Sequence, residues 1–308
     1  MTTLRLQLDE YLAYARSLRR SPVHLRMLRY SVLRTLLWLE ERHGVTAANQ
    51  LAVSHVTAWI AVVAARRTTK GVPVKQCTVA KQLDADRTFF SWLEQAGILP
   101  SAIPAALPRV KLPDFLPSSV LAHGQMIRLL ERIDVADPAG YQLRAMLELL
   151  YSSGVRIAEL LGMDLDAVDL GNAMTRVHGK GDKWRIVPLG RTAVRFLEGY
   201  LKGIRPLRLR EPEERAIWLG RDGHRLAYHV FRRQLEALTR DAGMPVTVTA
   251  HTFRRSCATE LVRGGANLWH VKDLLGHENL ETLKHYTRLT IVDLKKTHTR
   301  CHPRERRG

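Results

Sequence analysis

Apolar residues recur at helical spacing near the start of the chain. After Ser21 and Pro22, which suit a helix cap and a first turn, the stretch HLRMLRYSVLRTLLWLE carries one stripe, formed by Leu25, Leu28, Val32, Leu36 and Leu39. The pattern predicts an amphipathic helix that buries this stripe. Arg26, Arg29 and Arg34 lie off the stripe, so we expect them to face solvent or phosphates.

A second helical pattern begins near Thr78 and ends at Gly97, a residue suited to a helix C-terminus; its apolar positions are Val79, Leu83, Phe90 and Leu93. We therefore predict a helical N-terminal domain over residues 1–98. Prolines follow at positions 100, 104, 108, 113 and 117. Because prolines at this density exclude a helix, residues 99–118 are predicted to form an extended, proline-rich linker.

The pattern changes beyond the linker. Residues 125–133 and 139–151 look helical, whereas MTRVH and KWRIVP are short β-like runs separated by the turn-forming GKGD. These runs predict a hairpin, and the remainder is helical again, with Gly243, Gly264, Gly265 and Gly276 at helix ends. The predicted fold class is mainly α with a small β-sheet (α+β). The C-terminal domain spans 119–308, with a basic tail from about residue 290.

Charge adds the first indication of a partner. The 308 residues are enough for two domains with separate cores, and a hydrophobic fraction of 45% is typical of soluble globular proteins. Lys and Arg number 48 against 30 for Asp and Glu, a formal net charge of +18. This excess favours a polyanion, either nucleic acid or an anionic membrane surface, over the alternative of a basic solvated surface.

Several classes of protein are disfavoured. No apolar run approaches the roughly 18 to 20 residues of a membrane span, and MTTLRLQLDE lacks the apolar core of a signal peptide, which predicts a soluble cytoplasmic protein. The scattered Cys77, Cys257 and Cys301 argue against a disulfide framework. HTRCH at 298–302 is a conceivable metal cluster, but a basic tail is favoured because no second ligand pair is visible.

Three stretches of the second half carry candidate chemistry. In YSSGVRIAELLGM, Arg156 lies between a glycine-ended helix and a new one. In HGKGDKWRIVPLG, Lys180 stands between two glycines, which let a backbone approach another molecule closely. In TAHTFRRSCATELVRGG, His251 and Arg254 share one face at a helix start, which is a suitable place for a phosphate. Each taken singly also fits a surface residue or an ordinary turn.

A fourth stretch, HVKDLLGHENLETLKHYTR, reads as two helices. Asn267 caps the first helix, Gly276 ends it, and its predicted buried stripe is Leu268, Val271 and Leu274. His277 follows the glycine, and Tyr286 lies in the second helix. A tyrosine on a helix is packing far more often than it is a nucleophile.

The order of these motifs resembles a known family. SSGVRIAELLGM, HGKGDKWRIVPLG, HTFRRSCATEL and LLGHENLETLKHYTR, spread over 151–288, are similar to motifs of the tyrosine recombinases, which include phage integrases, Xer-type enzymes and transposon or integron integrases. The resemblance covers nearly the whole chain if residues 1–98 are the core-binding domain of the family. It then implies a helical core-binding domain followed by a catalytic domain.

The resemblance also implies roles for individual residues. Its catalytic set is Arg156, Lys180, His251, Arg254, His277 and the nucleophile Tyr286, and Glu159 matches a supporting acidic position. The chain departs from the family at Ser153, Phe253 and Arg255, where Thr, Leu and His are common. None of these departures removes a catalytic group, although Arg255 changes the contacts around the site.

The implied reaction is a transesterification that needs neither ATP nor another cofactor. Tyr286 attacks the scissile phosphorus and gives a 3′-phosphotyrosyl link and a free 5′-hydroxyl. Because a tyrosine hydroxyl has a pKa of about 10, His251 is a suitable general base, and Lys180 is the natural general acid for the leaving oxygen. Arginines can stabilise the transition state, so a cationic site predicts no metal requirement.

The expected partner is double-stranded DNA at specific recombination sites, gripped by the two domains as a clamp. We expect a monomer in free solution, a homo- or hetero-tetramer on synapsed DNA, and association with the nucleoid. The tail TRLTIVDLKKTHTRCHPRERRG is expected to dock on a neighbouring protomer, the alternative being a frayed end that contacts DNA.

Two other functions stay open. The chain can be a catalytically silent DNA-binding architectural factor, although all six catalytic positions are filled, or a type IB topoisomerase-like relaxing enzyme. The target sequence and the biological role, among chromosome dimer resolution, phage integration and excision, or transposon and integron mobility, depend on features that one sequence does not identify.

Overall fold

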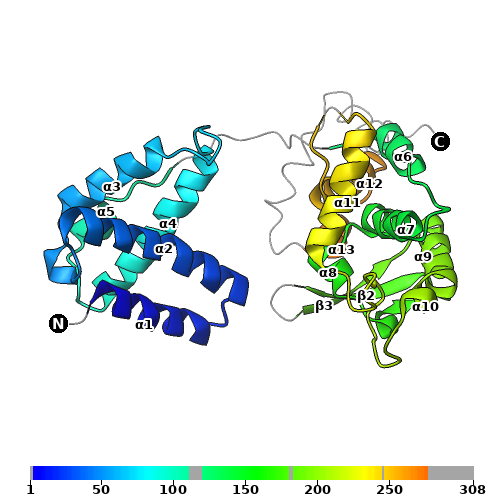
Figure 1. Cartoon of the computed structure of the whole chain (residues 1–308), viewed down its shortest axis with the longest axis horizontal. Coiled ribbons are helices and arrows are strands. Elements are labelled where there is room, and N and C mark those ends of the chain that lie inside the picture. The colour runs from blue at the N-terminus through cyan, green and yellow to red at the C-terminus, as the bar shows by residue number, and fades with distance from the viewer. Residues whose placement is uncertain (1–2, 111–119, 180–182, 245, 277–308) are drawn as a thin grey trace, which may run out of the picture. The chain divides into compact units, whose positions relative to one another are not determined.

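The chain divides into two compact units, residues 1–115 and 116–308 (Figure 1). The computed structural model describes residues 3–110, 120–179, 183–244 and 246–276. The boundary between the units falls inside the predicted linker, and each unit has its own hydrophobic core.

The first unit is built from helices. They are α1 (Leu4–Ser17), α2 (Pro22–His43), α3 (Val53–Ala65), α4 (Gln76–Gln95) and the short α5 (Ala102–Ala105), with a 3-10 turn at Ala48–Gln50. Ser21 caps α2 by accepting a hydrogen bond from the His24 backbone N–H at 3.2 Å. The predicted stripe of α2 is buried at Leu28, Val32, Leu36 and Leu39, and Leu25 is half-buried.

Two expectations for this unit are wrong. Arg34 does not simply face outward: it is half-buried between α2 and α4, where it donates to Gln82. The prolines also do not exclude a helix, because Pro104 lies in the first turn of α5, where a backbone N–H has no helical partner to lose. The apolar residues of this stretch are buried in the first core, at Leu99, Ile103 and Leu107.

A buried carboxyl joins three helices of the first unit. Asp86 on α4 accepts hydrogen bonds from Thr35 Oγ1 on α2 at 2.6 Å and from Trp59 Nε1 on α3 at 2.9 Å. Gln82 Nε2 donates to it from the previous turn at 3.0 Å. Burial raises the pKa of Asp86 to about 6, and the hydrogen bonds from Thr35, Gln82 and Trp59 oppose part of that rise.

The raised pKa predicts a local dependence of stability on pH. Because folded Asp86 binds its proton more tightly than the unfolded chain, the contribution of Asp86 to stability is complete below the unfolded pKa of about 4. This contribution, roughly 3 kcal/mol, is lost as pH rises through 6. Asp86→Asn should remove this component. Hydrogen exchange of the α2 and α4 amides at pH 5 and pH 7 measures it, with exposed Asp84→Asn as the matched control. An identical pH dependence in the wild type and Asp86→Asn would contradict the prediction.

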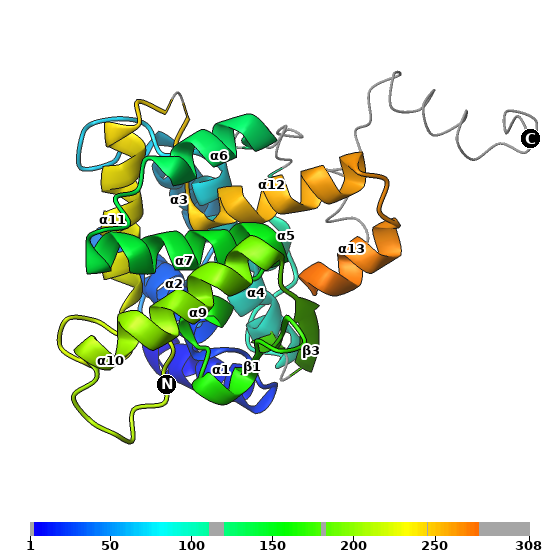
Figure 2. The same ribbon diagram turned by 90° about the vertical axis from the view of Figure 1, so that its right-hand side faces the viewer.

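The second unit is built around one of its own helices, α7 (Pro138–Ser153), which is largely buried. Its elements are α6 (His123–Glu131), α7 (Pro138–Ser153), α8 (Ile157–Leu161), a 3-10 turn (Leu165–Ala167), β1 (Val168–Asp169), β2 (Met174–Gly179), β3 (Lys183–Pro188), α9 (Arg191–Gly203), α10 (Arg205–Arg208), α11 (Tyr228–Asp241), α12 (Ala250–Arg263) and α13 (Leu268–Leu275). Helix α7 contacts α6, α9, α11 and α12 (Figure 2), and every residue from Ala145 to Leu150 is buried.

The strands form an antiparallel sheet in the order β1-β2-β3. Gly179 and Lys183 are the last pair of the β2–β3 ladder, on either side of residues 180–182, as the predicted hairpin requires. The described part of the chain is therefore mainly helical with one small sheet, which confirms the predicted fold class. Among the described residues, no helix is both long and apolar enough to cross a membrane.

Glycines end the helices next to the candidate motifs, as predicted. Gly154 follows α7 with φ +63°, and Gly276 follows α13 with φ +64°. Asn267 caps α13 by accepting from the Trp269 backbone N–H at 2.9 Å. The predicted stripe of α13 is corrected, because Val271 and Leu275 are buried against α12 whereas Leu268 is exposed.

Candidate active site

Arg156 is held at a sharp turn between α7 and α8. Gly154 ends the first helix, and Arg156 is the N-cap of the second. The Arg156 backbone N–H donates to Glu159 Oε2 at 2.8 Å, and Nη1 donates to Glu159 Oε1 at 2.7 Å. Its Nη2 donates to the Gly276 carbonyl at 2.8 Å. The side chain keeps 34% of its exposure, so an incoming phosphate can still reach the guanidinium.

Glu159 is the anionic centre of this group. Its side chain is only 4% exposed, and both oxygens accept hydrogen bonds from arginine N–H groups. Burial alone would raise the pKa of Glu159, but hydrogen bonds from Arg185 and Arg156 together with the Arg185 charge outweigh it, so the pKa lies below its ordinary value. The carboxylate is therefore ionised and fully engaged at neutral pH.

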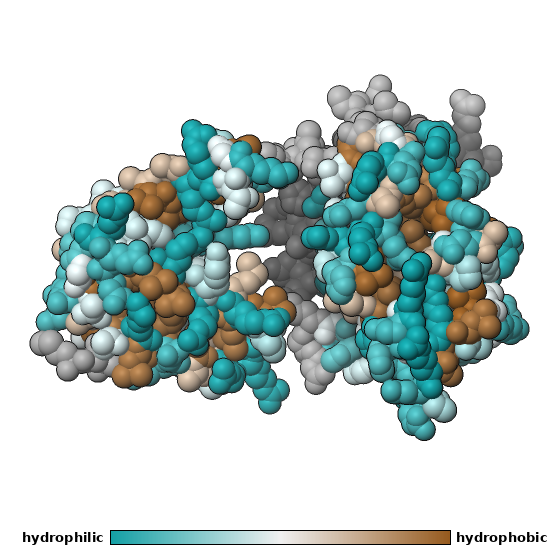
Figure 3. All heavy atoms as spheres, in the orientation of Figure 1, coloured by the Kyte–Doolittle hydropathy of each residue, from teal (hydrophilic) through white to brown (hydrophobic). Residues whose placement is uncertain are grey.

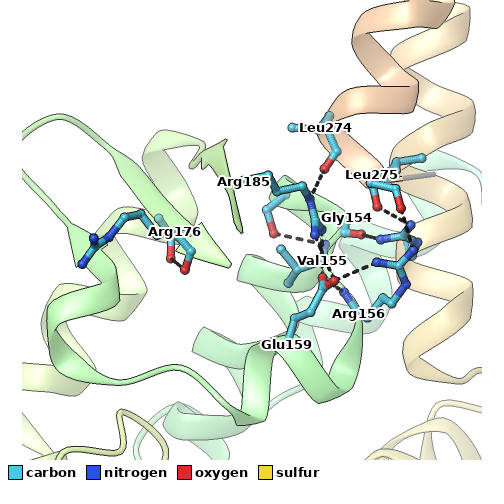
Figure 4. Close-up of polar contacts among 12 residues, drawn as sticks. Gly154, Val155, Arg156, Glu159, Arg176, Arg185, Leu274 and Leu275 are labelled. Carbon is cyan, nitrogen blue, oxygen red and sulfur yellow. Dashed lines mark hydrogen bonds and ion pairs between the residues drawn. The ribbon is translucent and has the colours of Figure 1, made fainter. Parts of the chain in front are cut away.

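Arg185 completes the group from β3 and was not among the residues singled out from the sequence. Its Nη1 and Nη2 donate to the two oxygens of Glu159 at 2.9 and 2.8 Å, and its Nε donates to the Leu274 carbonyl at 2.9 Å (Figure 4). The available signal was alternation along KWRIVP, which places Arg185 on the same face as the buried Val187. A charged residue at an inward position of a strand requires a buried partner.

Arg254 is buried in α12, with 2% exposure. Its Nη1 donates to the Gly154 carbonyl and its Nη2 to the Leu275 carbonyl, both at 2.6 Å. The carbonyls at the end of α13 thus each receive a different arginine: Leu274 from Arg185, Leu275 from Arg254 and Gly276 from Arg156. A helix C-terminus carries partial negative charge and unpaired carbonyls, so three cations stabilise it.

His251 lies in the first turn of α12, one turn before Arg254. Partial desolvation of the ring, followed by the charges of Arg255, Arg254 and Arg156, lowers the pKa of His251 below its ordinary value. The imidazole is therefore mostly neutral at pH 7 and can accept a proton. Arg254 donates to the carbonyl of Gly154, two residues before Arg156, and the charge of Arg156 acts on His251.

The other three residues of the implied set, Lys180, His277 and Tyr286, lie outside the described residues. The residues just before two of them do lie at the site. A Cβ atom on Gly179 would lie 3.6 Å from Glu159 Oε1, and one on Gly276 would lie 3.1 Å from Arg185 Cζ.

No cluster of metal ligands lies among the described residues of this site. The described residues contain no group of three or more His, Cys, Asp and Glu side chains able to hold a metal ion. Glu159, the carboxylate at the centre, is occupied by guanidinium groups. The HTRCH segment at 298–302 lies outside the described part of the chain.

Comparisons with known proteins identify relatives of this chain. Residues 119–291 match the model of the phage integrase family. The chain is 34% identical over 281 residues to tyrosine recombinase XerD of Listeria monocytogenes serotype 4b, covering 91% of each protein. It is 32% identical over 304 residues to tyrosine recombinase XerC of Mycobacterium bovis BCG, covering 97% of this chain and 98% of that protein.

A solved structure shares the fold. The XerH site-specific recombinase bound to a palindromic difH substrate, in a post-cleavage complex, aligns with a TM-score of 0.73 and 20% identity over 96% of this chain and 84% of that one. The family match spans more than half of the chain, and the match to XerC spans nearly all of it. The chain therefore belongs to the phage integrase family of tyrosine recombinases.

Proposed function

We propose that this protein cuts and rejoins DNA at specific sites through a 3′-phosphotyrosyl intermediate, with Tyr286 as the nucleophile. As a member of the family, the chain is a site-specific DNA recombinase. The observation that carries the residue assignments is the cluster of Arg156, Arg254 and His251, which segments far apart in the sequence bring together. A silent architectural factor and a relaxing topoisomerase are not favoured by the relatives, which are named as recombinases.

The proposed cleavage step exchanges one phosphoester for another. The Tyr286 oxygen bonds to the scissile phosphorus while the bond to the 5′ oxygen breaks. The tyrosine proton passes to His251, whose lowered pKa leaves the ring neutral and able to accept it. Lys180 supplies the proton that the leaving 5′ oxygen needs. A 5′-hydroxyl from another strand then attacks the phosphotyrosyl link and reverses the step.

Arg156 and Arg254 stabilise the extra negative charge of the pentacoordinate phosphorus in this proposal, and His277 adds a further donor. Guanidinium groups present paired N–H donors in a fixed plane, which matches phosphate oxygens. Their carbonyl and carboxylate partners hold both arginines before DNA arrives, and such preorganisation increases their effect on the transition state. Because arginines supply the positive charge, we propose a reaction independent of metal ions and ATP.

Both units are proposed to bind the same duplex as a clamp. Arginines are exposed on each of them, at Arg26 and Arg29 on α2 and at Arg232 and Arg233 on α11. Polar and apolar residues are interspersed on the visible face of each unit (Figure 3). The net charge of +18 supports binding to phosphates that weakens steeply with salt. Assembly as a homo- or hetero-tetramer, tail docking between protomers and residence at the nucleoid belong to the same proposal.

Strand exchange tests the proposal. A binding sequence is first selected from randomised duplexes, and two labelled duplexes carrying it are then mixed with protein in EDTA. We expect recombinant duplexes without magnesium or ATP, and none with Tyr286→Phe. Relaxation of supercoiled DNA without exchange, or exchange that needs magnesium, would contradict the proposal.

A further inference from the structure

We infer that Arg185 is a positioning residue that fixes Arg156 in the orientation needed to bind the scissile phosphate. The inference rests on the proposed function and adds a residue to which neither the sequence motifs nor the proposed mechanism assigns a role. It follows from the partners of Arg185, from the carboxylate it shares with Arg156, and from the space that two glycines leave for it.

Arg185 is bound by the protein itself. All three of its guanidinium nitrogens donate to protein oxygens, namely Leu274 O and the two oxygens of Glu159. The side chain is 15% exposed, against 34% for Arg156. Arg156 is thus the more accessible of the two arginines, whereas Arg185 is more buried and bound to Glu159.

The two arginines share one carboxylate. Oε1 of Glu159 accepts from Arg156 Nη1 and Arg185 Nη1, and Oε2 accepts from the Arg156 backbone and Arg185 Nη2. Hydrogen bonds to both oxygens fix the plane of the Glu159 carboxylate. The Arg156 guanidinium, which donates to this carboxylate, is therefore held in one orientation as well. Without Arg185, the Glu159 carboxylate would lose two of its four hydrogen bonds and could rotate away from Arg156.

Arg185 also fixes the other anchor of Arg156. Arg156 Nη2 donates to Gly276 O, at the end of α13, and Arg185 Nε donates to Leu274 O in the same turn. β3 and the N-terminus of α8 are therefore both joined to the end of α13. Loss of Arg185 would loosen both anchors of the Arg156 guanidinium at once.

Two glycines leave room for the Arg185 side chain. A Cβ atom on Gly276 would lie 3.1 Å from Arg185 Cζ and Nη1, and one on Gly179 would lie 3.3 Å from Nη1. Gly276 is also at φ +64°, a conformation that other residues rarely adopt. Gly179 and Gly276, nearly a hundred residues apart in the sequence, thus both lie close to the Arg185 guanidinium. A larger residue at either position would crowd this side chain.

The neighbouring strand offers a matched control. Arg176 on β2 is exposed, donates to the Asp166 carbonyl at 3.1 Å, and lies well away from Glu159 (Figure 4). Arg176→Ala removes the same charge from the same hairpin without touching the shared carboxylate. An effect seen with Arg185→Ala and absent from Arg176→Ala is therefore not a general effect of hairpin charge.

The test measures covalent complex formation on two suicide duplexes. One carries the ordinary scissile phosphate, and the other carries a methylphosphonate, in which a methyl group replaces one non-bridging oxygen and removes its charge. On phosphate, Arg185→Ala should lower the rate by about 10²-fold, because small misplacements of a binding group have effects of this size. On methylphosphonate the loss of rate should shrink to about threefold. The transition state then carries one negative charge fewer, so its stabilisation depends less on the position of Arg156.

A merely structural defect would give a different result. Misfolding lowers the active fraction equally on both duplexes, so equal losses would overturn the inference. Arg185→Lys, which keeps the charge but not the bidentate grip, should show the same pattern with a smaller loss. It replaces the alanine variant if that variant fails to fold.

A double variant separates positioning from direct contact. Arg156→Ala with Arg185→Ala should react on phosphate about as slowly as Arg156→Ala alone, because Arg185 acts through Arg156. Losses that multiply would show that Arg185 acts on the phosphate independently, and would overturn the inference. Failure of the proposed function gives a separate signature, in which the wild type forms no covalent complex on the phosphate duplex.

Discussion

Replacing Arg254 by alanine is expected to lower the rate of DNA cleavage by about 10²- to 10³-fold, the usual effect of removing one preorganised donor from a transition state. Arg254 is buried, and its two terminal nitrogens donate to the carbonyls of Gly154 and Leu275. The remaining N–H groups are thereby aimed in a fixed direction. The measurement is the single-turnover rate of covalent complex formation on a suicide duplex.

Controls separate this chemical effect from a folding effect. Arg254→Ala also leaves two carbonyls without their donor, so stability must be measured beside the rate. Arg254→Lys keeps the charge and should fold, but it lacks the fork and should still react at least tenfold more slowly. Arg263→Ala removes an exposed arginine of the same helix and should react like the wild type. Cleavage by Arg254→Ala at the wild-type rate would contradict the role given to Arg254.

Replacing Glu159 by alanine is expected to destabilise the second unit by roughly 3–5 kcal/mol, because breaking a buried ion pair leaves the partner charge uncompensated. Its side chain is 4% exposed and joins Arg156 to Arg185. Glu159→Gln retains the shape and should lose less. Urea unfolding measures both variants, with the exposed Glu236→Gln as the matched control.

The effect of Glu159 should depend on pH in a defined direction. The pKa of Glu159 is lowered in the folded protein, so its stabilisation is complete above the unfolded pKa of about 4.5 and is lost as pH falls through the folded pKa. The difference between the wild type and Glu159→Gln should therefore be largest near pH 7 and disappear in acid. A difference that stays constant down to pH 3 would contradict the assignment of Glu159 as an ionised, arginine-bound carboxylate.

Local features of the fold could be predicted from the sequence because their causes are local. Ser21 and Asn267 cap helices through backbone groups within a few residues, and Gly154 and Gly276 end helices through their own φ angles. The antiparallel pairing of β2 with β3 follows from the alternation along MTRVH and KWRIVP in the same way. Arg156 was likewise placed correctly between two helices, because glycine fixes that turn.

Contacts between distant residues were not predictable from the same patterns. Arg185 meets Glu159 across 26 residues and Leu274 across 89. Arg34 was expected to face outward, but Gln82, 48 residues away, draws it inward. The helix around Pro104 was missed because burial of Ile103 and Leu107 decides that segment, and local proline content does not. Periodicity assigns a side chain to a face, whereas the partner on that face depends on tertiary packing.

The central claim is that Tyr286 becomes joined to DNA, and covalent trapping tests it most directly. A suicide duplex carrying the selected site is incubated with the protein in EDTA, the complex is denatured, and the peptide attached to the DNA 3′ end is identified by mass spectrometry. We predict a stable protein–DNA complex with the phosphate on Tyr286, and none with Tyr286→Phe. A complex that persists in Tyr286→Phe, or a link to another residue, would contradict the account.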